Sequence, residues 1–362
     1  MKLGFLGPLY ARQGPYACAY LDTSRDLDDP DRAVERRRSR LRADLAAQGA
    51  DPATIGAVSR AVGGDLDPSG DQGRAVFAAH GRLALTAALP RPPRRDSARF
   101  TMLPDVMPLA LQRAPDIPYL AAAVRHTGAG GRGMEVTWQA GRWPATRVAD
   151  GNSRRRRVPA DERGRAATTV ARHLTELSDR TGAEVIVLSG DRWARDTIAR
   201  ELPPRLRGRT ARIHRGNDWS PRDERTLLED ELDYLLGGRL AEADRAVVRR
   251  FLTSRARRNG AAEGLAATVA ALRDGRVAAV LVNELFDPHL PLHVGVTPRQ
   301  IALTQRELAA HGVVSGWSEE TGAALVRAMV GGGAELVVVP RVELPLADGV
   351  GVLLRTPEGG PS

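Results

Sequence analysis

Four consecutive arginines, Arg154 to Arg157, are the residues whose type and spacing most clearly indicate a binding chemistry. A guanidinium group can hold a phosphate through two parallel hydrogen bonds, and each such contact releases counterions from an RNA backbone. Four adjacent positive charges repel one another and cannot share a core, so we predict a flexible loop that contacts RNA phosphates. The predicted RNA-contacting residues are Gly151, Asn152, Ser153, Arg154, Arg155, Arg156, Arg157, Arg163 and Arg165.

The charge of the whole chain supports an anionic partner mainly through its placement. The 362 residues carry 53 basic and 44 acidic side chains, a net charge of +9, and Lys2 is the only lysine. From Arg147 to Arg172 there are eight arginines against three acids, which is more than half of the net excess. Clustered charge of this kind favours a phosphate backbone. The alternative is a solvated charge run in an arginine-rich protein. Aromatic residues make up only 4%, which argues against broad base-stacking platforms.

A glycine-rich segment, Gly128 to Gly133, superficially suggests a phosphate-binding loop. Such a loop needs a helix directly after it, so that the helix N-terminus faces the phosphate. The following residues, Met134 to Trp138, alternate as in a strand, and we therefore expect a hairpin turn. The chain also lacks the glycine–serine motif of hydrolases and the lysine-containing nucleotide loop.

Metal and thiol chemistry are also not indicated. His289 and His293 have the spacing of two ligands on one helix face, but Pro288 and Pro291 exclude a regular helix there. The single cysteine, Cys18, lies in an apolar stretch, and we expect a buried, inert thiol. We expect no metal, no cofactor and no catalytic residue. No apolar run is long enough to span a membrane, and the first residues do not resemble a signal peptide, so we expect a cytoplasmic protein.

The order of apolar segments predicts an α/β protein of three domains. The first, residues 1–113, has a strand at Tyr16 to Leu21, a charged helix at Asp31 to Ala47 and a strand pair around His80-Gly81. The second, residues 114–216, contains a long helix at Arg163 to Thr181 between strands. The third, residues 220–356, alternates helices and strands, and residues 357–362 form a disordered tail. Its predicted elements are Asp223 to Arg257, Gly264 to Arg273, Pro298 to Gly312 and Thr321 to Val330 as helices, and Val277 to Val282, Glu335 to Val339 and Val350 to Leu354 as strands.

This order of segments resembles the bacterial archaeo-eukaryotic release-factor superfamily, and within it the actinobacterial branch of Pelota-like and Balon-type hibernation factors. The likeness covers nearly the whole chain and lies in the order of the motifs, none of which is strict. The segments that carry it are Tyr20 to Ser24, Ala75 to Phe77, Leu89 to Pro93, Ser189-Gly190-Asp191, Asp274 to Glu284, Gly333 to Val338 and Gly349 to Arg355.

The resemblance implies a three-domain, release-factor-like architecture and a non-enzymatic role. Release factors carry Gly-Gly-Gln in the central loop, where the glutamine helps water attack the peptidyl-tRNA ester. The corresponding loop here reads Gly151-Asn152-Ser153, without the glutamine. The expected function is therefore stress-linked ribosome hibernation, by binding to the A site and peptidyl-transferase rRNA of idle 70S ribosomes. Elongation factor Tu is implied as a further protein partner.

Two other functions stay open at this point. One is peptidyl-tRNA hydrolysis in ribosome rescue, with another loop residue positioning water. The other is general RNA binding unrelated to ribosomes, against which the order of the three domains argues.

Overall fold

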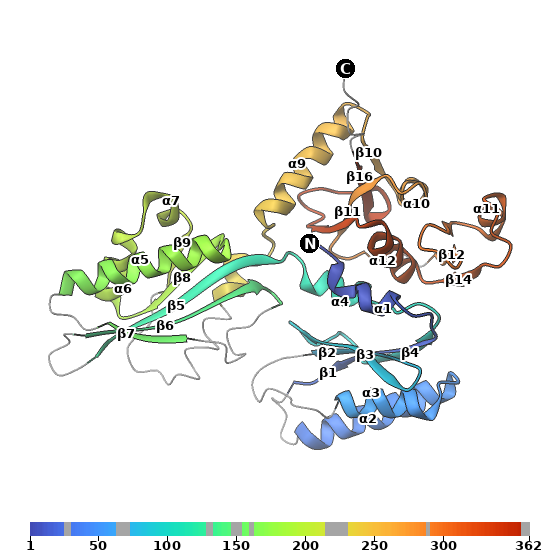
Figure 1. Ribbon diagram of the computed structural model, residues 1–362, viewed down its shortest axis with the longest axis horizontal. Helices are drawn as coiled ribbons and strands as arrows, with labels where there is room; N and C mark the ends of the chain where they lie inside the picture. Colours follow the sequence, from blue (N-terminus) through green and yellow to red (C-terminus); the bar gives the residue numbers. More distant parts are fainter. Residues whose placement is uncertain are drawn as a thin grey trace. The chain divides into compact units, whose positions relative to one another are not determined.

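The computed structural model describes residues 1–24, 30–62, 73–127, 133–145, 154–158, 163–213, 231–286 and 290–355. The chain divides into two compact units, residues 1–114 with 243–362, and residues 115–242. Each unit has its own mixed α/β architecture (Figure 1), in agreement with the predicted fold class. The division into three domains at 1–113, 114–216 and 220–356 stays a prediction.

The amino-terminal part of the first unit is a four-stranded antiparallel sheet of order β3-β2-β1-β4. Successive residues of β1 point to opposite faces, and both faces are buried: Ala17 and Ala19 pack toward α2 and α3, whereas Tyr16 and Cys18 join the other core. His80 and Gly81 have positive φ angles of 52° and 73°, as a two-residue hairpin turn between β2 and β3 requires. The elements are β1 (Tyr16–Asp22), α2 (Pro30–Ala47), α3 (Pro52–Val62), β2 (Gly73–Ala79), β3 (Arg82–Leu89), β4 (Ser97–Thr101) and, beside them, η1 (Gly4–Leu6), α1 (Gly7–Tyr10) and α4 (Met107–Arg113).

The carboxy-terminal part of the same unit holds a four-stranded sheet of order β10-β16-β11-β15 and a small antiparallel sheet of order β13-β12-β14. The apolar strand β11 pairs in parallel with β15 and antiparallel with β16, and its residues are mostly buried. The elements are α9 (Glu242–Ala256), β10 (Ala261–Glu263), α10 (Leu265–Arg273), β11 (Val277–Asn283), β12 (Leu292–Val294), β13 (Ile301–Ala302), α11 (Gln305–Ala310), β14 (Trp317–Glu319), α12 (Thr321–Gly332), β15 (Glu335–Val339), η3 (Ala347–Gly349) and β16 (Val350–Leu354).

Two predicted helices are wrong in their extent. The expected helix at Pro298 to Gly312 is a short strand, β13, followed by the six-residue helix α11. Thr304 caps the helix, because its hydroxyl accepts a hydrogen bond from the backbone N–H of Glu307. In the predicted run Asp223 to Arg257, the described part forms one helix at residues 231–236 and another, α9, from Glu242. Gly237 and Gly238 interrupt it, and Gly238 has a φ of 73°.

The second unit is a five-stranded mixed sheet of order β7-β6-β5-β8-β9. Strands β7, β6 and β5 are antiparallel, whereas β5, β8 and β9 are parallel. Helices α5 and α6 cover one face (Figure 1) and bury an apolar cluster against it. The elements are β5 (Ile117–Thr127), β6 (Gly133–Trp143), β7 (Arg154–Val158), α5 (Arg163–Thr181), β8 (Val185–Gly190), α6 (Arg192–Glu201), α7 (Pro204–Arg207) and β9 (Thr210–Arg212).

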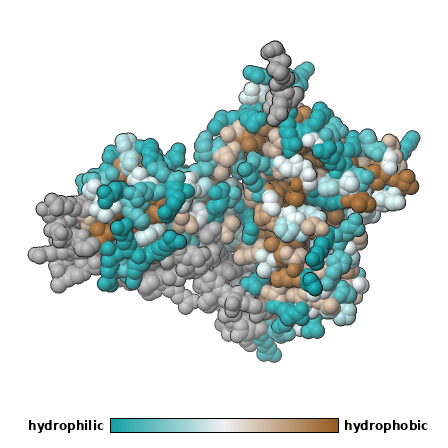
Figure 2. Space-filling model, viewed as in Figure 1, coloured by the Kyte–Doolittle hydropathy of each residue, from teal (hydrophilic) through white to brown (hydrophobic). Residues whose placement is uncertain are grey.

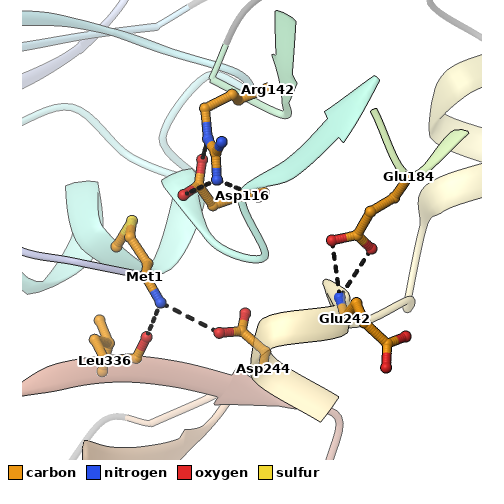
Figure 3. Close-up of polar contacts among 7 residues, drawn as sticks. All are labelled: Met1, Asp116, Arg142, Glu184, Glu242, Asp244 and Leu336. Carbon is orange, nitrogen blue, oxygen red and sulfur yellow. Dashed lines mark hydrogen bonds and ion pairs between the residues drawn. The ribbon is translucent and has the colours of Figure 1, made fainter. Parts of the chain in front are cut away.

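Polar contacts fix the ends of segments within each unit (Figure 3). In the second unit, Arg142 holds the carboxylate of Asp116 through two hydrogen bonds of 2.5 and 2.9 Å, and Glu184 accepts the backbone N–H of Glu242 at 2.8 Å. In the first, the amine of Met1 donates to the carbonyl of Leu336 at 2.7 Å and pairs with the Asp244 carboxylate. No helix in the described part of the chain is long and apolar enough to cross a membrane.

Candidate nucleic-acid interface

The four consecutive arginines form most of a short strand, β7, and not the loop that the sequence predicted. Arg154 lies directly across from Trp138 of β6, and Arg156 lies across from Val136. The prediction of a loop was wrong because repulsion between neighbours weakens in a strand, where adjacent side chains point to opposite faces. Pairing with β6 also satisfies one edge of the β7 backbone while every guanidinium stays in solvent.

Strand β7 lies at the edge of the five-stranded sheet, and all four arginine side chains are exposed. Arg155 forms an ion pair with the nearly buried carboxylate of Glu135. The other three arginines make no ion pair with any residue that the structure describes. The exposed edge strand is therefore a strip of positive charge, and a guanidinium group can hold a phosphate through two parallel hydrogen bonds.

The remaining predicted residues are placed only in part. Gly151, Asn152 and Ser153 lie outside the described residues, directly before β7. Arg163 and Arg165 belong to the first turn of α5, which begins at Arg163 as predicted. Whether these residues contact RNA stays a prediction.

An aromatic pair that the sequence analysis did not single out lies beside the strand. Trp138 of β6 and His173 of α5 are half-buried, and their rings meet edge to face with centroids 4.6 Å apart. Burial lowers the pKa of His173, and the nearby Arg156 guanidinium lowers it further, so the imidazole is biased toward its neutral form. Its Nε2 atom is buried without a hydrogen-bond partner among the described residues. The sequence signal that could have identified Trp138 is its alternation with polar neighbours in β6.

The glycine-rich segment and the histidine pair are described only in part. Residues 128–132 lie outside the described part, but Gly133 opens strand β6, which pairs antiparallel with β5. A strand therefore follows the glycine segment, as predicted, and not a helix. His289 lies outside the described residues, and His293 lies in strand β12. Among the residues that can be described, no three His, Cys, Asp or Glu side chains are grouped to hold a metal ion.

Comparison with known proteins points to one family. The model of the bacterial archaeo-eukaryotic release factor family 2 matches residues 118–257. Two uncharacterized proteins of Mycobacterium tuberculosis, from strains CDC 1551 / Oshkosh and ATCC 25618 / H37Rv, are each 31% identical over 361 residues, covering 96% of this chain and 95% of the relative.

Similar solved structures include Pelota proteins. Archaeoglobus fulgidus Pelota is 13% identical and covers 80% of each chain, with a TM-score of 0.40. Dom34 of Saccharomyces cerevisiae is 12% identical with the same coverage and a TM-score of 0.35. A model of ribosome-bound archaeal Pelota and ABCE1 contains a chain that is 14% identical; the match covers 98% of this chain and 95% of that one, with a TM-score of 0.37.

Proposed function

Because this chain belongs to the bacterial archaeo-eukaryotic release factors, we propose that it is a cytoplasmic ribosome hibernation factor. In this proposal it binds the A site of idle 70S ribosomes, contacts the rRNA there and toward the peptidyl-transferase centre, and blocks translation without chemistry. Elongation factor Tu is proposed as a further partner. Membership in a release-factor family supports the ribosome as the target.

The observation that carries the proposal is the arginine edge strand β7. Three of its four exposed guanidinium groups have no ion-pair partner among the described residues, and together they offer a local surplus of positive charge. Each phosphate neutralised by such a group releases counterions and strengthens binding, with roughly 0.7 to 0.9 in the slope of log affinity against log salt. Ribosomal RNA presents such phosphates along its whole backbone.

The same segment supports a binding role over hydrolysis. Ester hydrolysis needs an ordered nucleophile and donors aimed at the developing oxyanion. The tripeptide Gly151-Asn152-Ser153 has no glutamine to position water, and it leads directly into side chains suited to anchoring phosphates. Rescue by peptidyl-tRNA hydrolysis is therefore the second candidate.

Sedimentation of a lysate from starved cells tests the proposal. We expect the protein to migrate with 70S particles at low salt and to leave them as the salt concentration rises. Lysate from growing cells, with ribosomes engaged in translation, is the control and should show less ribosome-bound protein. Migration only with free protein in both lysates would contradict the proposal.

A further inference from the structure

The two faces of strand β7 differ in what surrounds their arginines. In an antiparallel pair, residues directly opposite one another share a face. Arg154 and Arg156 lie opposite Trp138 and Val136, whose side chains pack toward α5, so this pair lies on the helix-covered side of the sheet. Arg155 and Arg157 lie on the other side.

The acidic neighbour of the strand lies on only one of these faces. Glu135 is directly opposite Arg157 and pairs with Arg155, and its side chain is only 9% exposed. One carboxylate thus offsets part of the charge of Arg155 and Arg157. No ion pair between Arg154 or Arg156 and another described residue offsets the charge on the helix-covered side. Phosphate binding should therefore be stronger there.

The helix-covered side also carries the means to hold a base. Trp138 lies across from Arg154, and its ring contacts that of His173. The positive charge of Arg156 lowers the pKa of His173. Base stacking on an aromatic ring is tolerant of sequence, and guanidinium groups next to the ring hold the flanking phosphates. The imidazole Nε2, buried and without a partner in the described part of the chain, is a polar atom that a ligand group could satisfy.

We propose that Arg154, Arg156, Trp138 and His173 form a binding site for one unpaired nucleotide of single-stranded RNA. Arg154 and Arg156 hold the phosphates on either side, and the base stacks against the Trp138–His173 pair. Unpaired nucleotides fit this arrangement better than a duplex, because their bases are free to leave the stack. The inference rests on the proposed function, since it specifies which part of ribosomal RNA the arginine strand recognises.

The alternation of the strand supplies a matched pair of variants. R154A/R156A and R155A/R157A remove the same charge from the same strand, but from opposite faces. Affinity is measured with a fluorescein-labelled single-stranded oligoadenylate across a salt series. We expect R154A/R156A to weaken binding at least about tenfold and to lower the salt slope by about 1.4, or two phosphates. R155A/R157A should change affinity by less than about threefold. Thermal unfolding of both variants checks that the fold is retained.

The aromatic contribution is tested separately with W138L and W138F. Leucine keeps an apolar side chain against the core but removes the ring, and we expect it to weaken oligonucleotide binding about tenfold or more. W138F keeps a ring and should recover most of the affinity. If W138L does not fold, quenching of tryptophan emission by the oligonucleotide decides, because wild-type protein should be quenched more than W138F. Equal quenching of the two proteins would overturn the stacking site.

The outcomes separate this inference from the hibernation proposal when 70S sedimentation is measured in parallel. Wild-type protein that sediments with ribosomes, while its two double variants lose oligonucleotide affinity equally, overturns the one-sided site alone. Wild-type protein that fails to sediment, while R154A/R156A loses oligonucleotide affinity and R155A/R157A does not, contradicts the hibernation proposal and supports the site.

Discussion

Whether this chain hydrolyses peptidyl-tRNA depends on what the side chains of Asn152 and Ser153 can do in place of the release-factor glutamine. Both are shorter than glutamine, and the adjacent arginines favour anchoring over the placement of water. We expect no release of peptide from peptidyl-tRNA in the P site of 70S ribosomes when purified protein is added. A release factor with its Gly-Gly-Gln intact serves as the positive control. Sustained release that N152A or S153A abolishes would establish the rescue function instead.

The reactivity of Cys18 tests whether its side chain is buried in the folded protein. The thiol is 2% exposed, and burial raises its pKa to about 12, so the reactive thiolate is scarce at neutral pH. We expect iodoacetamide at about pH 8 to leave the folded protein unmodified and to alkylate Cys18 after unfolding in guanidinium, as measured by intact mass. Equally fast alkylation of folded and unfolded protein would show that the site opens readily. The predicted buried position of this cysteine is confirmed.

Strand β7 should contribute to ribosome binding in two ways, through the charge of its arginines and through the geometry of their guanidinium groups. Replacing Arg154 to Arg157 with alanine should weaken binding and lower the salt slope by about 1.4 or more, because Arg154 and Arg156 each hold a phosphate. Three of the exposed substitutions should each change stability by less than about 0.5 kcal/mol, whereas loss of Arg155 costs more because it leaves the nearly buried Glu135 carboxylate without its ion pair. Thermal unfolding of the variant checks that the fold is retained.

A quadruple lysine variant is the matched control for that experiment. Lysine keeps the charge but cannot form two parallel hydrogen bonds to a phosphate, so the salt slope should stay while affinity falls modestly. A quadruple alanine variant with unchanged affinity and salt slope would remove β7 from the interface.

Glu319 of β14 holds the segment between β4 and α4 against its own strand and makes the stability of the first unit depend on pH. Its carboxylate accepts the amide of Leu103 at 3.2 Å and the indole N–H of Trp317 at 2.8 Å. Burial raises its pKa, so the folded protein keeps this proton up to a higher pH than the unfolded chain does. Stability from this group is therefore present below the unfolded pKa and is lost as pH rises through the folded value.

Two variants separate these effects. E319A leaves two donors without an acceptor and should lower the free energy of unfolding by about 1–3 kcal/mol, measured by urea denaturation. E319Q keeps an acceptor and cannot ionise, so it should lose less stability than wild type as the pH rises above the ordinary pKa of a glutamate. Parallel pH profiles for wild type and E319Q would show that Glu319 does not titrate in this range.

Periodicity predicted the long elements well and failed where short-range chemistry decided. The α5 helix, the β2–β3 hairpin and the apolar strands β11 and β15 lie where the sequence indicated, because each has a continuous apolar pattern. The small strands β10, β12 and β14 were missed, since three residues carry too little pattern.

The candidate site was predicted only in part for a related reason. Charge composition identified Arg154 to Arg157, but repulsion alone suggested a loop, and pairing with β6 is a non-local contact that local sequence does not show. The Trp138–His173 contact joins residues that are 35 positions apart, on a strand and a helix. Only the packing of α5 on the sheet brings them together.

For the molecule as a whole, the proposed A-site position predicts competition. Purified protein on vacant 70S ribosomes should be displaced by excess A-site tRNA and should itself slow tRNA binding. The physical reason is mutual exclusion from one space, as distinct from any chemical change. Deacylated tRNA restricted to the P site is the control and should bind without effect. Simultaneous binding of protein and A-site tRNA would refute the site assignment while leaving ribosome association intact.

Some apolar side chains are exposed on the surface of the first unit. Figure 2 shows hydrophobic residues on the visible face near α11 and β14. Val296 and Val314 are 58% and 85% exposed. Scattered exposed apolar residues are normal in globular proteins, and we assign no partner to them.

The core of the first unit can be completed only after nearly the whole chain has been synthesised. Leu9 and Leu109, from the beginning of the chain, share one apolar cluster with Ala324 and Leu336, from near its end. At about 5–20 residues per second, the intervening residues 115–242 take on the order of ten seconds to emerge. Until the carboxy-terminal segment has also emerged, the early strands lack their partners in this cluster, whereas the contiguous middle unit can fold once residue 242 has emerged. Nascent chains that stall in this interval should therefore depend on chaperones.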